Sequence, residues 1–209
     1  MFFDLKELAG ITPKKVKHAP CQQQVYGPDG PLLDMLPILT CWPHDGGPFI
    51  TLPVVITKDP ETSTQNAGMY RMHKYDNATT GMHWQYNKDG TRHFDKYKSR
   101  GERMDVAVAL GGPPLATYAA TAPMPPDMDE FLLAGFIGSH PIEITRAKTV
   151  DIFVPAESDF IIEGYVDPKE DRVEGPFGDH TGFYSPADLY PVFHVTCICL
   201  LYTSDAADD

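Results

Sequence analysis

Long hydrophobic runs are absent from this chain of 209 residues. No stretch approaches the roughly 18 consecutive apolar residues that indicate a membrane-spanning helix. The opening residues, Met1-Phe-Phe-Asp-Leu-Lys6, also lack the basic-then-apolar layout of a secretory signal peptide. No internal repeat period is visible. The sequence therefore predicts neither a transmembrane segment nor a solenoid.

Basic residues are also scarce, because 17 Lys and Arg stand against 29 Asp and Glu, for a formal net charge of -12 at pH 7. This balance disfavours a polyanion-binding surface, so nucleic acid is not expected as a partner, although a local pocket could still hold one phosphate. With 42% hydrophobic and 22% charged residues, the remaining composition is that of an ordinary globular protein of one or two domains.

Cysteine is limited to four residues, Cys21, Cys41, Cys197 and Cys199. They are too few and too scattered for a disulfide scaffold. Cys197 and Cys199 alternate within an apolar run, which is typical of strand residues rather than of a metal-binding pair. The expected compartment is therefore a reducing cytoplasm.

Short apolar segments bounded by Gly, Pro, Asn and Asp outnumber the helix-like segments. Strands are predicted at residues 21–25, 49–57, 66–71, 79–86, 105–110, 142–147, 150–154, 160–166 and 189–200. Helices are predicted at 1–10, at 93–104 with an interruption at Gly101, and from a cap at Asp127 to Ile137, with a turn at 87–90 and a loop at 116–126. This pattern predicts an α+β domain built on an antiparallel sheet or barrel with helices packed outside.

Composition also divides the chain. Residues 1–48 are rich in Pro and Gly and are interpreted as a linker-like segment from a truncated front region. Residues 49–200 carry the predicted domain, and residues 201–209 depart in composition and are interpreted as a non-native tail.

The loop Glu174-Gly-Pro-Phe-Gly-Asp179 holds two carboxylates across a turn that is half glycine. If the two acids face one space shielded from water, one should keep a proton that the other lacks, which suits proton transfer. The alternative is a surface turn with two solvated acids, the ordinary fate of such a spacing.

Other candidate residues carry weak signals when each is taken alone. Arg71 offers a planar fork for a carboxylate or phosphate, or is an exposed strand arginine. His83, beside a tryptophan, is a ligand or a hydrogen-bonded core histidine. Glu130 is a ligand or a helix-capping glutamate. Asn66 is a ligand or a turn residue. His180 either adjusts the acidity of the neighbouring Asp179 or is a structural hydrogen-bond partner.

Taken together, these residues resemble the UbiD family of decarboxylases over about residues 49–200. Five motifs stand in the family's order: Asn66-x-Gly-x-Tyr-Arg71, Gly81-Met-His83-Trp84, Asp129-Glu130-Phe-Leu-Leu-Ala-Gly135, Val154-Pro-Ala-Glu-Ser-Asp-Phe-Ile-Ile-Glu-Gly164 and Glu174-Gly-Pro-Phe-Gly-Asp179-His-Thr-Gly-Phe-Tyr184. The resemblance implies a flavin-reductase-like split β-barrel that binds prenylated flavin mononucleotide (FMN). It also implies a divalent ion, Mn²⁺ or Mg²⁺, with a monovalent cation such as K⁺ nearby.

The same resemblance assigns roles by motif position. Asn66 and Glu130 match metal ligands, and so does His83, although some relatives carry arginine there. The residues that match flavin-lining positions are Met69, Tyr70, Arg71, His83, Trp84 and Gln85, with Lys88 as a phosphate contact and residues 121–125 close by.

For the reaction, the resemblance implies that an electron-accepting cofactor supports loss of CO₂ and that an acid then protonates the carbon. Asp179 is the implied proton donor, and Glu174 with Arg71 completes the acid–base network. Arg71 should keep one carboxylate ionised, while burial raises the pKa of the other. Some relatives have glutamate at the donor position. The shorter aspartate of this chain places the acid differently, which leaves open a different substrate class.

The expected substrate is a 4-hydroxybenzoate-type or other unsaturated acid of quinone biosynthesis. A prenylated substrate would place the protein at a membrane surface. A flavin prenyltransferase is the expected cofactor supplier, and a homo-oligomer is the expected assembly. Two alternatives remain: an inactive flavin-binding or assembly domain, and a flavin-free metal hydrolase that uses the two loop acids.

Overall fold

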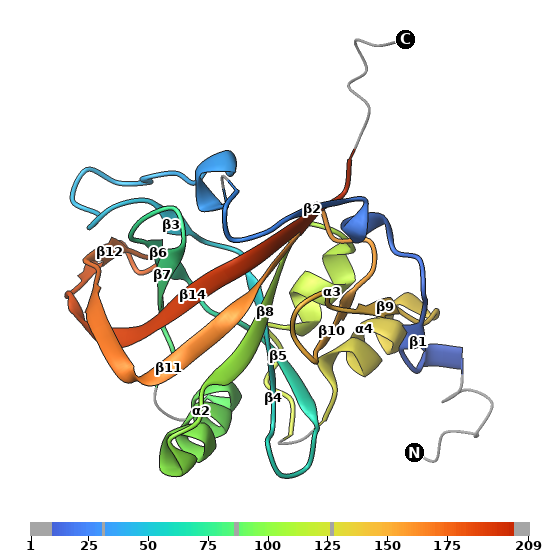
Figure 1. The fold of residues 1–209 in the computed structure, drawn as a ribbon. Helices are drawn as coiled ribbons and strands as arrows, with labels where there is room; N and C mark the ends of the chain where they lie inside the picture. The colour runs from blue at the N-terminus through green and yellow to red at the C-terminus, as the bar shows by residue number, and fades with distance from the viewer. Residues whose placement is uncertain (1–9, 31, 86–87, 126–127, 203–209) are drawn as a thin grey trace, which may run out of the picture.

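An antiparallel sheet of nine strands organises the computed structural model, which describes residues 10–30, 32–85, 88–125 and 128–202. Eight of its strands lie in the spatial order β3 (Phe49–Ile50), β6 (Met72–Lys74), β7 (Thr79–Met82), β14 (Asp188–Leu200), β11 (Phe160–Glu174), β8 (Met104–Leu110), β4 (Val54–Lys58) and β5 (Gln65–Met69). The ninth, β2 (Gln24–Tyr26), pairs with the end of β14. The long central strands β11 and β14 run side by side, and the sheet curls around them (Figure 1). The predicted α+β class with an antiparallel split barrel is confirmed.

Both faces of the central strands are buried, which explains their continuous apolar runs. On β8, Val106 and Val108 face one core while Ala107 and Ala109 face the other. Phe94 of helix α2 (Asp89–Arg100) packs into the first core. Two further helices, α3 (Pro114–Ala119) and α4 (Glu130–Gly138), pack together against the second. The three-stranded sheet of β1 (Lys14–Lys15), β9 (Glu143–Arg146) and β10 (Phe153–Pro155) lies on the same side.

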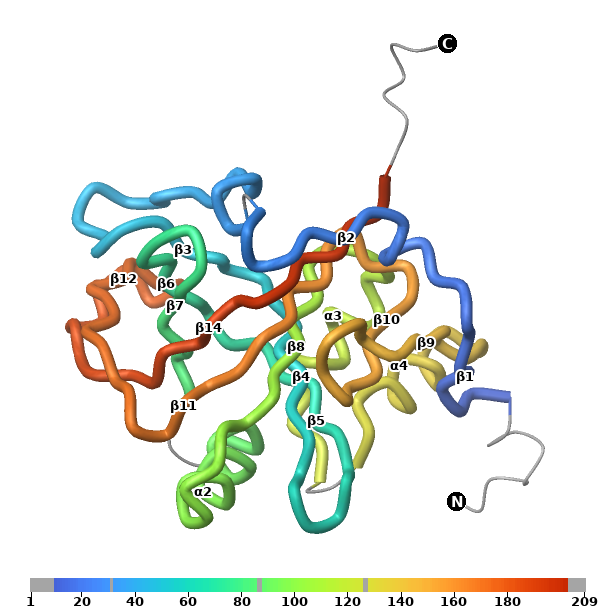
Figure 2. Tube along the Cα trace, viewed as in Figure 1, coloured from blue at the N-terminus to red at the C-terminus, as the bar shows by residue number. Residues whose placement is uncertain are grey.

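The front segment runs along the sheet, as the blue part of the trace shows (Figure 2). Strand β1 pairs in parallel with β9, and the short helix η1 (Pro20–Gln22) buries Cys21. A second short helix, η2 (Leu33–Met35), buries Leu33 in the first core. Most of the predicted helix at 1–10 and of the proposed tail at 201–209 lies outside the described residues. Among the described residues, no helix has the length and apolar character needed to cross a membrane.

Several predicted boundaries are wrong. The strand predicted at 49–57 is interrupted around Pro53, so that β3 and β4 lie in different parts of the sheet. Helix α2 begins at Asp89 rather than at residue 93, and Gly90 in its first turn packs closely against Trp84. The strand predicted at 79–86 ends at Met82, and residues 21–25 divide into η1 and the start of β2.

The predicted loop at 116–126 and the predicted helix cap at Asp127 also differ from the structure. Residues 116–126 were expected to be irregular, but α3 begins at Pro114, since proline suits the first turn of a helix. The cap of α4 is Asp129, whose carboxylate accepts a hydrogen bond from the backbone nitrogen of Phe131 at 2.8 Å. Asp127, the predicted cap, lies outside the described residues.

Candidate functional site

A cavity of about 600 Å³ lies where β5 and the residues after it meet helices α2, α3 and α4. Its volume falls within the range of cofactor sites, roughly 300–1,000 Å³. Six of the predicted site residues line it: Asn66, Met69, Tyr70, Arg71, Lys88 and Glu130. Residues 120–124 form another wall, held by a hydrogen bond from the nitrogen of Met69 to the oxygen of Ala120 at 3.2 Å. The fold thus gathers residues that are far apart in sequence.

Glu130 and Asn66 lie together on one side of this cavity. Glu130 is the first residue of α4, and its Oε2 accepts a hydrogen bond from the nitrogen of Ala67 at 2.8 Å. Burial outweighs this bond and raises the pKa of Glu130 to about 7. The side-chain Nδ2 of Asn66 is buried, and Asn66 interacts with the hydroxyl of Tyr70. Because burial opposes the ionisation of Glu130, its carboxyl is a candidate cation ligand, and the amide oxygen of Asn66, not its Nδ2 donor, is the atom of that side chain able to join it.

Arg71, Glu174 and His83 form a buried network beside the cavity. The Nε and Nη2 of Arg71 donate to the two carboxylate oxygens of Glu174 at 2.8 and 3.1 Å, and the Nδ1 of His83 lies 3.2 Å from Oε2. Glu174 is fully buried at the end of β11. Burial opposes its ionisation, but the hydrogen bonds from His83 and Arg71 prevail and lower the pKa of Glu174 to about 2. Glu174 is therefore a fixed anion that orients Arg71.

Asp179 occupies a different environment from Glu174. It lies between the short strands β12 (Phe177–Gly178) and β13 (Tyr184–Ser185), and its Oδ1 accepts hydrogen bonds from the nitrogen and the hydroxyl of Thr181. These bonds lower the pKa of Asp179. The expectation that one of the two loop acids has a raised pKa is wrong for this structure, because Asp179 is solvated. The next residue, His180, lines the cavity.

The remaining predicted residues lie around the network rather than along the cavity wall. His83 packs against Tyr190 with ring centroids 4.3 Å apart, and buried Trp84 packs against Phe94 at 5.2 Å. The Nε1 of Trp84 has no partner among the described residues. Gln85 is exposed, and its carbonyl oxygen accepts a hydrogen bond from the hydroxyl of Thr91 at the start of α2.

Residues 42–47 hold the acidic loop in place, a role that sequence reasoning missed. The Oδ1 of Asp45 accepts a hydrogen bond from the nitrogen of Gly178 at 2.8 Å, and the nitrogen of Gly46 donates to the oxygen of Pro176 at 2.8 Å. Gly46 approaches Gly175 so closely that a Cβ would clash with its carbonyl oxygen. The Asp-Gly-Gly triplet was a usable signal, since it favours tight turns and close backbone approach.

Comparison with known proteins places these motifs in a family. Residues 14–203 match the UbiD family profile, described as 3-octaprenyl-4-hydroxybenzoate carboxy-lyase Rift-related domain. An uncharacterised protein of Archaeoglobus fulgidus is 54% identical over 195 residues, which cover 93% of this chain and 40% of the relative. One of Aquifex aeolicus is 50% identical over 198 residues, covering 94% and 40%. The chain thus spans about two fifths of the length of these relatives.

Solved structures agree with the profile. The UbiD-class enzyme HmfF from Pelotomaculum thermopropionicum, in complex with prFMN, matches with a TM-score of 0.88 and 30% identity, covering 95% of this chain and 48% of that one. The vanillic acid decarboxylase of Sedimentibacter hydroxybenzoicus in closed form also matches with a TM-score of 0.88, at 28% identity over 95% of this chain and 45% of that one. The two neighbours share the split-barrel fold described above.

Proposed function

This chain belongs to the UbiD family, and from that premise we propose that it is the flavin-binding part of a decarboxylase that removes CO₂ without oxidation from an aromatic or unsaturated carboxylic acid. The observation that carries the proposal is the cavity in which Asn66, Arg71 and Glu130 converge. The proposed substrate is of the 4-hydroxybenzoate type, as in quinone biosynthesis, which agrees with the description of the matched family.

The residues present fit prenylated FMN and a divalent cation. The amide oxygen of Asn66 and the buried carboxyl of Glu130 offer the oxygen ligands that Mn²⁺ and Mg²⁺ prefer, and Lys88 at the cavity rim offers charge to a phosphate. His83 is proposed as a third ligand, although its Nδ1 is engaged by Glu174 in this structure. K⁺ is proposed as the monovalent companion. When bound, the flavin supplies the electron-accepting system that decarboxylation at an sp² carbon requires.

The protein's own groups would position the substrate and control the proton. Arg71 is held by Glu174 and also donates from Nη1 to the hydroxyl of Ser185 at 3.0 Å, so its guanidinium is fixed at the cavity wall. Such a fork suits the carboxylate of an acid substrate. Asp179 is the proposed proton donor, on the loop that ends at the cavity with His180. Shielding this loop from water would raise the pKa of Asp179, as a donor at neutral pH requires.

The test combines cofactor loading with turnover. The chain, and the full-length gene product, would be co-expressed with a flavin prenyltransferase, and the absorption spectrum, the mass of the released cofactor and the metal content would be measured. Prenylated flavin together with manganese is the expected result. If neither version binds flavin, the proposed cofactor is wrong. Oligomeric state would be measured on the same samples, with a homo-oligomer expected for the full-length protein.

Asp179→Asn separates catalysis from binding, because the amide keeps the shape of the side chain but cannot donate the required proton in the same way. We expect decarboxylation to fall by at least about 100-fold, with flavin binding unchanged. Equal loss of flavin and turnover in this variant would contradict the donor role.

A second candidate is a flavin-binding part without activity of its own. It is favoured by the solvated position of Asp179 and by the fraction of its relatives that the chain spans. Water around a reacting carbanion would quench it before selective protonation. Flavin in both versions, but turnover in the full-length protein alone, would support this candidate.

A further inference from the structure

A second group of potential metal ligands lies near the start of β11, at the other end of that strand from Glu174. Glu163 on β11 stands opposite Cys197 on β14, and Cys199 follows on the same strand. The three side chains are fully or almost fully buried. The Sγ atoms of Cys197 and Cys199 are 3.9 Å apart, and the Sγ of Cys199 is 3.6 Å from Oε1 of Glu163. All three ligand atoms lie within 4.8 Å of one another.

Glu163 differs from the other buried carboxylates in its partners. Asp59 has Lys96 at 2.6 Å and Glu174 has Arg71 at 2.8 Å, and burial raises the pKa of Glu130. Glu163 has no basic side chain within ion-pair distance among the described residues. A buried carboxylate is stabilised by a cation, by protonation or by hydrogen bonds. Without a basic partner, Glu163 can accept a cation as a countercharge.

The orientation of Glu163 is already fixed. The nitrogens of Lys148 and Thr149 donate to its two oxygens at 2.9 and 2.6 Å, and the hydroxyl of Thr149 donates at 2.7 Å. Metal-binding carboxylates are commonly held by hydrogen bonds of this kind. The loop at 148–149 thus presents the carboxylate toward the two thiols instead of leaving it free to rotate.

From this arrangement we propose that Glu163, Cys197 and Cys199 form a binding site for a thiophilic divalent cation, Zn²⁺ in the first instance. Bond lengths of about 2.3 Å to sulfur and about 2.0–2.2 Å to oxygen in a tetrahedral site separate neighbouring ligands by roughly 3.5–3.8 Å. The observed separations of 3.9 and 3.6 Å need little adjustment. Binding replaces the two thiol protons with the cation, and both protons leave to solvent. The sulfur ligands distinguish this site from the Asn66–Glu130 pair, whose oxygen ligands favour Mn²⁺ or Mg²⁺.

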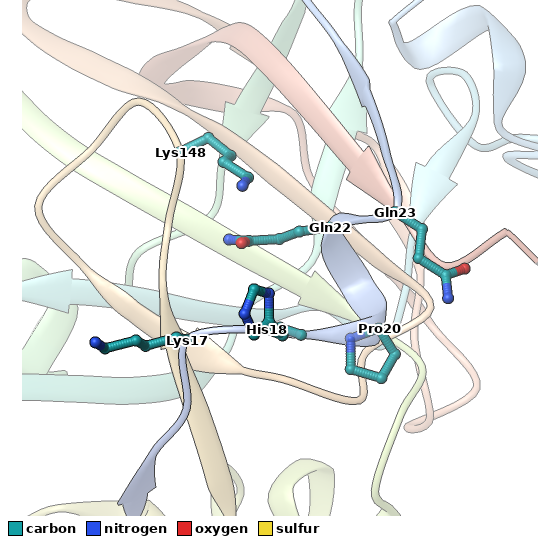
Figure 3. A pocket seen from close by; sticks show the side chains of 7 residues that line it. Lys17, His18, Pro20, Gln22, Gln23 and Lys148 are labelled. Carbon is teal, nitrogen blue, oxygen red and sulfur yellow. The ribbon is translucent and has the colours of Figure 1, made fainter.

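A cavity of about 490 Å³ lies close to this group and is shown in Figure 3, although none of the three ligand residues lines it. It is lined by Gln22, next to buried Cys21, and by Lys148, whose nitrogen holds Glu163. The side chains of Lys148 and Gln22 point toward each other across it (Figure 3). Helix η1, which forms one wall, packs against both β11 and β14. The cation would therefore tie these two strands to the loop at 148–149.

The test measures zinc and cobalt binding on the full chain. Protein expressed with added Zn²⁺ and then dialysed should retain about one zinc per chain, and Co²⁺ should give the charge-transfer band of thiolate coordination. Cys197→Ser and Cys199→Ser should each weaken binding at least about tenfold. Cys21→Ser is the matched control, since Cys21 is equally buried in the same core but lies outside the ligand group, and it should bind like the parent.

A double variant guards against loss of fold. Cys197→Val with Cys199→Val keeps the apolar core, so it should fold with the parent's circular dichroism and yet bind no zinc. Absence of zinc and of the cobalt band in the parent protein would overturn the proposal. Equal loss in Cys21→Ser, or zinc retained by the double valine variant, would overturn it as well.

Discussion

Glu130→Gln offers the sharpest test of the electrostatics of the cavity. The amide has the shape of the protonated acid, and its oxygen can still accept the hydrogen bond from the nitrogen of Ala67. In the parent protein without metal, burial raises the pKa of Glu130 from 4.5 to about 7. Because the folded pKa is raised, the neutral form favours folding at pH values below 4.5, and this contribution is lost as the pH rises through 7.

The size of the effect follows from the two pKa values. The difference between about 7 and 4.5, at about 1.4 kcal/mol per pKa unit, corresponds to about 3.5 kcal/mol as an upper limit. Since the carboxyl keeps some contact with solvent, we expect the variant to be more stable than the metal-free parent by about 1–3 kcal/mol at pH 8. The two proteins should be equally stable near pH 4.

Denaturant unfolding in the presence of a chelator, repeated from pH 4 to 8, measures this difference directly. Glu102→Gln is the control, because Glu102 is exposed and its substitution should shift stability little at any pH. Added Mn²⁺ should stabilise the parent and leave Glu130→Gln unchanged. A stability difference that does not vary with pH would refute the burial argument, and equal stabilisation of both proteins by Mn²⁺ would refute the ligand role.

Two further substitutions test the network and the loop. Arg71→Met leaves Glu174 buried without its guanidinium partner, so we expect a loss of about 3–5 kcal/mol in the free energy of unfolding, and a loss below 1 kcal/mol would contradict the pairing. Gly46→Ala places a Cβ against the carbonyl oxygen of Gly175, so hydrogen exchange should accelerate in the acidic loop while the central strands stay protected, and unchanged exchange there would contradict the clamp.

The sequence predicted the parts of the fold that depend on local pattern. The Asp-Val-Ala-Val-Ala-Leu run at 105–110 became β8, and the run at 189–200 became β14, because apolar runs that are bounded by turn residues and contain valine or isoleucine favour a buried strand. Local sequence pattern gave a wrong prediction at residues 87–90, which read as a turn. Helix α2 begins at Asp89 instead, and Gly90 packs against Tyr70 and Trp84, which are distant or outside the helix in sequence.

The candidate site was also predicted only in part from the sequence. Motif order predicted that Arg71 and Glu174 act together, and the structure joins them through two hydrogen bonds. The state of Asp179 could not be predicted, because it depends on the bonds from Thr181 and on how much water reaches the loop. Likewise, nothing in the spacing of Cys197 and Cys199 reveals Glu163, which comes from a different strand.

The strand pairings also determine when the domain can be completed during its synthesis. Strand β2, near the front of the chain, pairs with the last residues of β14, where Val25 lies opposite Cys199. Asp45, also near the front, accepts a hydrogen bond from the nitrogen of Gly178. Contacts of such wide sequence separation form late, since the intervening chain must first be made and ordered. On the ribosome, β8 would wait with an open edge for β11, and β7 for β14, a state prone to wrong pairing. The cavity that would hold a cofactor is therefore complete only after nearly the whole domain has left the ribosome.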